Sequence, residues 1–129
     1  MSNHYLLDTN AAIARIRKDA DLETLFRTAE QIYVPVIVLG ELYYGAENSR
    51  RVEENIKAVE MFVVNTVVLN CDAETAREFG KIAHMLRLKG RPIPENDIWI
   101  AALAQQHSLT LVTRDMHFDD IHGLSLERW

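Results

Sequence analysis

Residues 4–10 read His-Tyr-Leu-Leu-Asp-Thr-Asn, a short apolar run followed at once by residues that favour helix caps and turns. The run predicts a strand over 4–7 with a helix after it. Further apolar segments at 31–34, 66–69 and 109–112 alternate with longer stretches of helical periodicity, and a last short strand is expected at 125–126. This alternation is typical of βα units around a parallel sheet. We therefore expect an α/β fold: a three-layer α/β/α sandwich with a short, mostly parallel sheet of four or five strands.

The helix boundaries follow from local signals. Asp72 is a good N-cap residue, Gly90 suits the end of the same helix, and Pro35 should stop the second strand. The segment 91–94 contains two prolines and should be extended, because the residue before a proline avoids the helical region. The expected helices cover residues 11–18, 21–30, 36–46, 49–62, 73–88 and 95–107.

The composition fits one globular domain. The chain has 129 residues, 48% of them hydrophobic, so we expect a single domain over residues 1–129. No window approaches the roughly 18 consecutive apolar residues of a membrane span, and the N-terminus does not resemble a secretory signal, so no membrane partner is expected. Cys71 is the only cysteine, which excludes an internal disulfide and suits the reducing cytoplasm, where we expect the protein to act.

The net charge of −5 argues against a protein that grips nucleic acid through a broad basic face. It does not exclude a nuclease. A site that holds divalent metal must concentrate carboxylates, and the bound cations then reverse the local charge.

Two acidic residues come directly after apolar strands. Asp8 follows the run at 4–7, and Asp115 stands just beyond the run at 109–113. The carboxyl ends of parallel strands face the crevice in which ligands bind. A cap or turn role would explain either residue by itself. Together they predict two carboxylates at one edge of the sheet.

Two more acidic residues lie in apolar helices. Glu41 is the only charged residue within 32–46, where an ionised carboxylate is costly unless it is paired or bound to metal. The polar edge of an amphipathic helix is the alternative explanation. Asp97 occupies the first turn of the 95–107 helix, where the helix dipole favours an acid. It also aligns with Ala101 and Ala104, which should face the sheet.

As a set, Asp8, Glu41, Asp97 and Asp115 predict a metal site. Carboxylates that repel one another are held together by cations or shared protons. Oxygen ligands without a histidine cluster favour Mg²⁺ or Mn²⁺ over Zn²⁺. Such a site suits phosphodiester hydrolysis, in which metal activates water and stabilises charge on the leaving oxygen.

The same residues carry a resemblance to a known family. Residues 7–10 (Leu-Asp-Thr-Asn) and 41–46 (Glu-Leu-Tyr-Tyr-Gly-Ala) resemble the first two signatures of PIN-domain toxins of the VapC type. Residues 92–97 (Pro-Ile-Pro-Glu-Asn-Asp) are similar to the third signature and 111–115 (Leu-Val-Thr-Arg-Asp) to the fourth. The resemblance covers the whole chain in the same order and implies a PIN-like fold.

The resemblance also implies function. It implies a metal-dependent endoribonuclease, the toxin of a type II toxin–antitoxin pair, which cuts RNA, is neutralised by a cognate antitoxin and commonly forms a homodimer. It implies metal ligation by the four acids. Asn10 and the hydroxyl of Thr113 would support the site. The chain departs from the family pattern at His117, where an acid is common, so the fifth acidic ligand stays open and Asp119 is the nearest substitute.

Basic residues near the site are candidates for contact with the RNA backbone. Arg15 follows the first acid, Arg91 precedes the third, and Arg114 stands where the family often has asparagine. Solvated helix ends would explain Arg15 and Arg91 at least as well, and simple exposure would explain Arg114.

Three other functions stay open. An aspartate-dependent phosphatase could use Asp8 as nucleophile, although phosphatases of the haloacid-dehalogenase kind usually have a second acid where this chain has Asn10. A non-catalytic PIN-like module would keep the fold and only bind a partner or RNA. A DNA-directed nuclease would use the same carboxylates as a ribonuclease.

Overall fold

Five parallel strands form the centre of the computed structural model, which describes residues 3–129. They pair in the order β3-β2-β1-β4-β5, and all four pairings are parallel. The expected parallel sheet is confirmed. The strands are β1 (His4–Leu7), β2 (Gln31–Pro35), β3 (Val67–Leu69), β4 (Thr110–Val112) and β5 (Leu126–Glu127).

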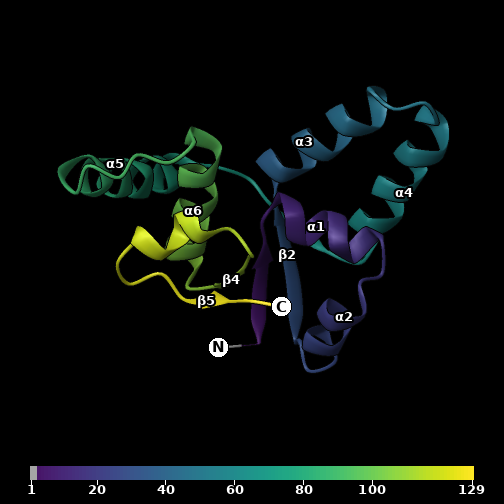
Figure 1. Ribbon diagram of the computed structural model, residues 1–129, viewed down its shortest axis with the longest axis horizontal. Helices are drawn as coiled ribbons and strands as arrows, with labels where there is room; N and C mark the ends of the chain where they lie inside the picture. The colour runs from purple at the N-terminus through teal and green to yellow at the C-terminus, as the bar shows by residue number, and fades with distance from the viewer. Residues whose placement is uncertain (1–2) are drawn as a thin grey trace.

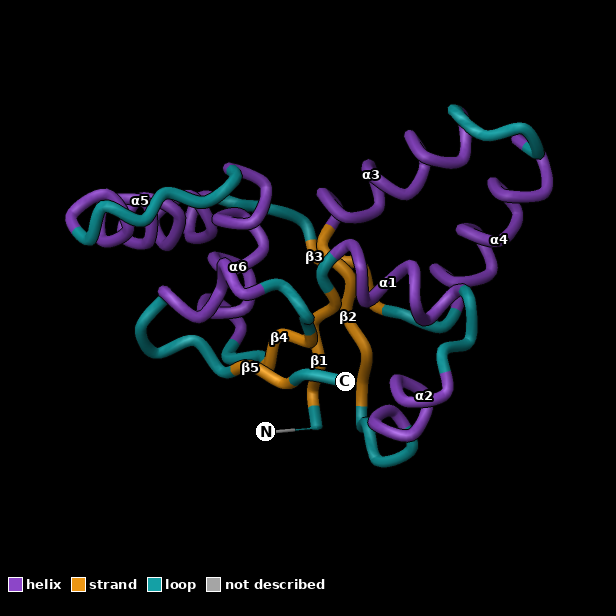
Figure 2. Tube along the Cα trace, viewed as in Figure 1, coloured by secondary structure: helices purple, strands orange, loops and turns teal. Residues whose placement is uncertain are grey.

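Helices cover both faces of the sheet, as Figures 1 and 2 show. One face carries α1 (Thr9–Ile16), α2 (Ala20–Phe26), α3 (Val36–Glu47) and α4 (Val52–Val64). The other carries α5 (Ala73–Leu88), α6 (Glu95–His107) and the short 3₁₀ helix η1 (Met116–Asp120). The three-layer α/β/α sandwich is therefore confirmed.

The order of the connections creates a crevice between β1 and β4. From β1 the chain crosses over one face to β2 and then β3, whereas from β3 it crosses back over the other face to β4. Ligand sites in open α/β sheets form at the carboxyl ends of strands where the strand order reverses in this way. Asp8 follows β1 and Thr113 follows β4, so both residues lie at this point.

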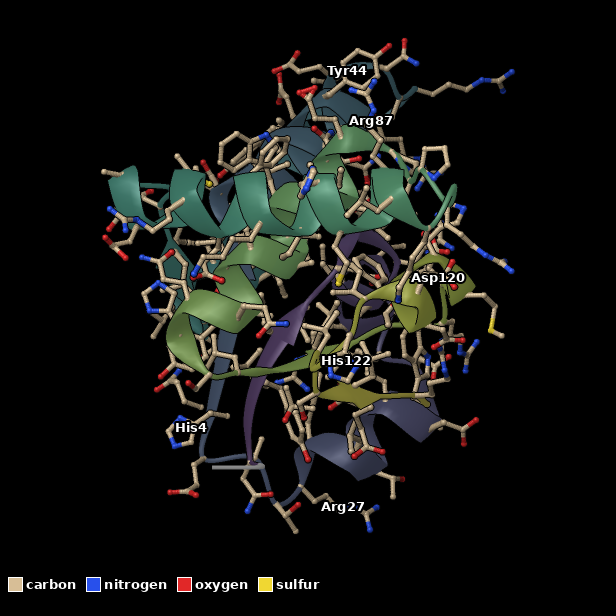
Figure 3. The ribbon with its side chains drawn as sticks, turned by 90° about the vertical axis from the view of Figure 1, so that its left-hand side faces the viewer. His4, Arg27, Tyr44, Arg87, Asp120 and His122 are labelled. Atoms are coloured by element: carbon tan, nitrogen blue, oxygen red, sulfur yellow. The ribbon has the colours of Figure 1, made fainter. Side chains whose placement is uncertain are left out.

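The strands run from one end of the molecule toward the other. In Figure 3, His4 and Arg27 lie at the lower end, and Tyr44 lies at the opposite end, beyond the carboxyl edge of the sheet. Leu6, Leu7 and Leu111 are completely buried. Because helices cover both faces, these strands are continuously apolar rather than alternating.

Local signals explain the boundaries of α5, which matches its predicted range. The Asp72 carboxylate accepts a hydrogen bond from the Thr75 backbone N–H at 3.1 Å, and the Thr75 hydroxyl accepts one from the Asp72 N–H at 2.9 Å. This reciprocal capping box satisfies two backbone donors at the helix start. Beyond the last turn, Gly90 has a φ of +67°, in the left-handed region that glycine adopts without a steric penalty.

Several boundaries differ from those expected. Helix α1 lies two residues earlier than the predicted range, and α4 begins at Val52 rather than at Ser49 and ends at Val64 rather than at Phe62. Helix α2 ends at Phe26 rather than near Glu30, because the Glu30 N–H bonds the Asn3 carbonyl at 2.9 Å and draws the chain into the sheet. Pro35 does not stop β2 but forms its last residue, opposite Leu69, and α3 begins at the next position. Among residues 3–129, no helix combines the length and apolarity that crossing a bilayer requires.

Candidate functional site

An open cleft of about 490 Å³ brings the four predicted acids together. Each comes from a different element: Asp8 caps α1, Glu41 lies in α3, Asp97 occupies the first turn of α6, and Asp115 caps η1. The predicted convergence on one edge of the sheet therefore exists in the fold. The remaining residues of the cleft wall are Thr9, Asn10, Pro94, Glu95 and Asn96.

Asp8 is the most deeply buried of the four acids, with 4% of its surface exposed. One carboxylate oxygen accepts a hydrogen bond from the Ala11 backbone N–H at 2.8 Å, which caps α1. The other accepts one from the Thr113 hydroxyl at 2.5 Å. The capping role and the position in the cleft are thus compatible, since each carboxylate oxygen has two lone pairs.

Thr113 links two of the acids. Its buried hydroxyl donates to Asp8 and also accepts a hydrogen bond from the Asp115 backbone N–H at 2.9 Å. The ends of β1 and β4 are thereby joined through one side chain. Thr113 fixes the distance between the segments that carry Asp8 and Asp115.

Replacing Thr113 with valine should lower the free energy of unfolding by about 1.5–3 kcal/mol, the range for hydrogen bonds to charged groups. Valine keeps the shape but leaves the buried Asp8 oxygen and the Asp115 N–H without this partner. Urea unfolding measures the change. The Thr113→Ser variant, which retains the hydroxyl, should keep most of the stability. An equal loss in both variants would assign the effect to packing of the methyl group.

Glu41 and Asp97 extend the carboxylate group across the cleft. The Thr9 hydroxyl donates to Glu41 at 2.7 Å, so the residue next to Asp8 orients the acid from α3. Asp97 is partly buried, and its side-chain oxygen lies 3.4 Å from the imidazole Nδ1 of His117. The same Nδ1 lies 3.1 Å from an Asp115 oxygen. One ligand atom from each of Asp97, Asp115 and His117 falls within 4.8 Å of the others.

The carboxylates affect one another electrostatically. Burial raises the pKa of Asp8, hydrogen bonds from Thr113 and Ala11 oppose that shift, and the charges of Asp97 and Asp115 raise it further. Burial also raises the pKa of Asp97, against a hydrogen bond from His117, with added repulsion from Asp115 and Glu41. Both pKa shifts mean that ionising the Asp8 and Asp97 carboxyl groups is unfavourable without a compensating positive charge.

Asp97→Asn should stabilise the metal-free protein at neutral pH. A carboxyl whose pKa is raised by folding contributes its full stability below its unfolded pKa and loses it as the pH rises through the folded pKa. Asparagine does not ionise. The gain in Tm over wild type should therefore be present at about pH 7 and shrink toward about pH 4, near the unfolded pKa.

Thermal unfolding in EDTA at both pH values measures this gain. The matched control is Asp21→Asn, which makes the same change at an exposed position in the first turn of α2. A gain in Asp97→Asn that does not depend on pH would contradict the electrostatic explanation.

Asp119 does not line the carboxylate cleft. Its side chain forms an ion pair with Arg128, and the Arg128 guanidinium also reaches the backbone oxygens of Thr113 and Asp115, each at 3.4 Å. The side chain next to Asp97 and Asp115 is that of His117 rather than Asp119. The contact between Asp119 and Arg128 joins η1 to the segment after β5, which the sequence spacing does not reveal.

The three arginines proposed for RNA contact have different surroundings. Arg15 pairs with Glu23 at 2.5 Å, and its guanidinium lies over the Phe26 ring. Arg114 stacks on the Trp129 ring at 4.4 Å and donates to the Trp129 carbonyl at 2.9 Å. Arg91 is exposed in the extended segment that leads to α6. Among residues 3–129, the wall of the carboxylate cleft includes none of these three side chains.

Comparison with known proteins identifies the family. The family model of the PIN domain matches residues 5–124. The chain belongs to the PIN-domain family. This PIN domain is 39% identical to ribonuclease VapC2 of Haemophilus influenzae and 35% identical to the tRNA(fMet)-specific endonuclease VapC of Shigella flexneri, with 97% of each chain covered in both cases. It also superposes on a chain in the crystal structure of DNA-bound VapBC from Salmonella typhimurium, with a TM-score of 0.92 and 34% identity, covering 100% of this chain and 99% of that one.

The family assignment agrees with the resemblance seen in the sequence. The PIN domain carries its four gathered acids at positions that resemble the family signatures. Two contacts in the same region had no clear signal in the sequence: the Thr9 hydroxyl on Glu41, and Arg128 on the backbone beside Asp115. Thr9 could have been suspected, since it adjoins Asp8 in the first signature.

Proposed function

We propose that this PIN domain is a metal-dependent endoribonuclease in which Asp8, Glu41, Asp97 and Asp115 hold Mg²⁺ or Mn²⁺. The observation that carries the proposal is the convergence of four carboxylates, from four separate elements, on one open cleft. Membership of the PIN family and relatives named as VapC ribonucleases support it. They favour a nuclease over the aspartate-dependent phosphatase that the sequence left open.

The residues of the cleft fit a hard divalent cation. Their donors are carboxylate oxygens, the ligands that Mg²⁺ and Mn²⁺ prefer. Burial, with added repulsion from the other carboxylates, raises the pKa of Asp8 and of Asp97, and a bound cation would stabilise the charged form of both groups. A bound cation would also reverse the local charge, which otherwise repels a phosphate backbone.

When bound, the metal would activate water for attack on phosphorus and stabilise the charge on the leaving oxygen. Neighbouring groups hold the carboxylates of the cleft in fixed orientations. Thr113 and the N-terminus of α1 fix the orientation of Asp8, and Thr9 fixes that of Glu41. Asn10, exposed on the cleft wall, offers an amide to a phosphate or sugar oxygen.

The proposed substrate is RNA. The cleft is open, which suits a polymer backbone lying across the carboxylates rather than a small enclosed ligand. Arg91 is our leading candidate for contact with the RNA backbone, because it is exposed and lies three residues before the cleft residue Pro94. Arg15 and Arg114 are weaker candidates, since both already contact groups within the protein.

We further propose that the protein acts as the toxin of a toxin–antitoxin pair and forms a homodimer. Several similar structures are of VapBC, from Rickettsia felis and Salmonella typhimurium among others. Expression of a toxin arrests growth, and co-expression of this protein with the product of the neighbouring open reading frame should relieve that arrest. Growth arrest that persists with every adjacent gene would exclude the role. Analytical ultracentrifugation of the purified protein tests the dimer.

The nuclease proposal is tested by incubating the purified protein with RNA, single-stranded DNA and duplex DNA, each with Mn²⁺, Mg²⁺ or EDTA. We expect cleavage of RNA that needs a metal and stops in EDTA. Cleavage of DNA alone would assign a DNA-directed nuclease. Cleavage that is equally fast in EDTA would exclude a metal-dependent mechanism. Binding of RNA without cleavage, with either metal present, would favour the non-catalytic module.

A further inference from the structure

His117 places an imidazole nitrogen beside two of the carboxylates of the cleft. Its Nδ1 lies 3.1 Å from an oxygen of Asp115 and 3.4 Å from an oxygen of Asp97. Asp115 caps η1 and Asp97 lies in the first turn of α6, so the imidazole lies where these two helices meet. The side chain is about half exposed, which leaves it accessible to an ion from solvent.

The spacing of these three groups fits one metal ion. In octahedral coordination with bonds of roughly 2.1 Å, adjacent ligand atoms lie about 3 Å apart. The distances from Nδ1 to the two carboxylate oxygens are close to that edge length. One ligand atom from each of Asp97, Asp115 and His117 lies within 4.8 Å of the others, so the three groups are close enough to approach one ion together.

The protein holds His117 in this place from several sides. Its backbone N–H donates to Asp115 at 2.9 Å, and the next residue, Phe118, is completely buried. Further along η1, the Lys89 ammonium donates to the Asp120 carbonyl at 2.8 Å. The backbone around the imidazole is thereby anchored both to the core and to the end of α5, which favours a defined ligand position.

We infer that His117 is a nitrogen ligand of the metal site and that it shifts the selectivity of the site from Mg²⁺ toward Mn²⁺. Oxygen donors alone suit Mg²⁺, whereas imidazole binds transition ions such as Mn²⁺ more readily than it binds Mg²⁺. This inference rests on the proposed function, because it assumes that the cleft holds a divalent ion. Beyond that function, it identifies His117 as a ligand and predicts a preference for Mn²⁺ over Mg²⁺.

A second role for His117 is consistent with the same distances from its Nδ1 to Asp97 and Asp115. The imidazole could donate a hydrogen bond to the carboxylates and act in place of a cation when metal is absent. The two roles predict opposite effects of removing the side chain. Loss of a ligand weakens metal binding, whereas loss of a competing positive group strengthens it.

The experiment measures Mn²⁺ and Mg²⁺ binding to purified wild type, His117→Ala and His117→Asp by calorimetry. For His117→Ala we expect Mn²⁺ affinity to fall about tenfold or more, since loss of even an outer partner of a metal ligand costs roughly 10–100-fold. Mg²⁺ affinity should fall much less. His117→Asp should bind Mg²⁺ at least as well as wild type. The control is His122→Ala, which removes an exposed histidine two residues after η1.

Electron paramagnetic resonance of bound Mn²⁺ adds a readout that does not depend on activity. Coupling to an imidazole nitrogen should be present in wild type and in His122→Ala, and absent in His117→Ala. Unchanged or tighter Mn²⁺ binding by His117→Ala, with the coupling retained, would falsify the inference while leaving the carboxylate site intact. Wild type that binds neither metal would overturn the metal-dependent function as well.

Discussion

An Asp97→Asn variant should cleave RNA about a thousandfold more slowly than wild type, a loss of about 4 kcal/mol in transition-state stabilisation. Asp97 lies in the cleft with Asp8, Glu41 and Asp115, and asparagine removes one of the negative charges proposed to hold the metal. The change is nearly isosteric. The backbone N–H of Asp97, which bonds the Pro94 carbonyl at 3.0 Å, is unaffected, so α6 should still begin at Glu95.

Single-turnover cleavage of a defined RNA in Mn²⁺ measures this loss. Asp21→Asn makes the same charge change in the first turn of another helix and should cleave at the wild-type rate. A variant at position 97 that keeps more than about a tenth of the activity would place the chemistry elsewhere, since a tenfold change corresponds to only about 1.4 kcal/mol. The expected increase in stability of metal-free Asp97→Asn separates lost chemistry from lost folding.

Phe118→Ala should lower the free energy of unfolding by about 3–5 kcal/mol, the usual range for truncating a buried phenylalanine. Phe118 is completely buried, although it belongs to a 3₁₀ helix of only five residues. The ring anchors the segment that carries Asp115 and His117. Its removal would leave a cavity and also loosen that side of the cleft.

Urea denaturation followed by tryptophan fluorescence measures the change. Met116→Ala is the matched control, because Met116 lies in the same short helix with 68% of its surface exposed. That control should change the stability by less than about 0.5 kcal/mol, as surface substitutions usually do. Similar losses in the two variants would mean that Phe118 does not anchor η1 to the core.

Some features could be predicted from neighbouring residues alone. Helix α5 begins and ends where the signals around Asp72 and Gly90 place it, because capping bonds join residues three positions apart. The 4–7 strand is confirmed because a continuous apolar run bounded by capping residues has few other structures open to it. The gathering of Asp8 and Asp115 followed from the parallel sheet, in which successive carboxyl ends share an edge.

The end of α2 could not be predicted in this way. No residue within 21–30 opposes a longer helix. The chain departs from the helix because the Glu30 N–H donates to the carbonyl of Asn3, which directly precedes β1. Asp119 and Arg15 are similar cases. The sequence suggested a ligand role for Asp119 and RNA contact for Arg15. In the fold these side chains pair with Arg128 and Glu23, which come from other segments, and neither lines the cleft.

The sequence by itself therefore determined the layer architecture and the four acids of the cleft, because apolar periodicity, caps and strand ends act over a few residues. The tertiary structure decided which donors surround those acids. Thr113 bridges Asp8 to Asp115, and His117 lies between Asp97 and Asp115. These contacts depend on how η1, α6 and the ends of β1 and β4 pack together, and packing between distant segments leaves no local pattern in the chain.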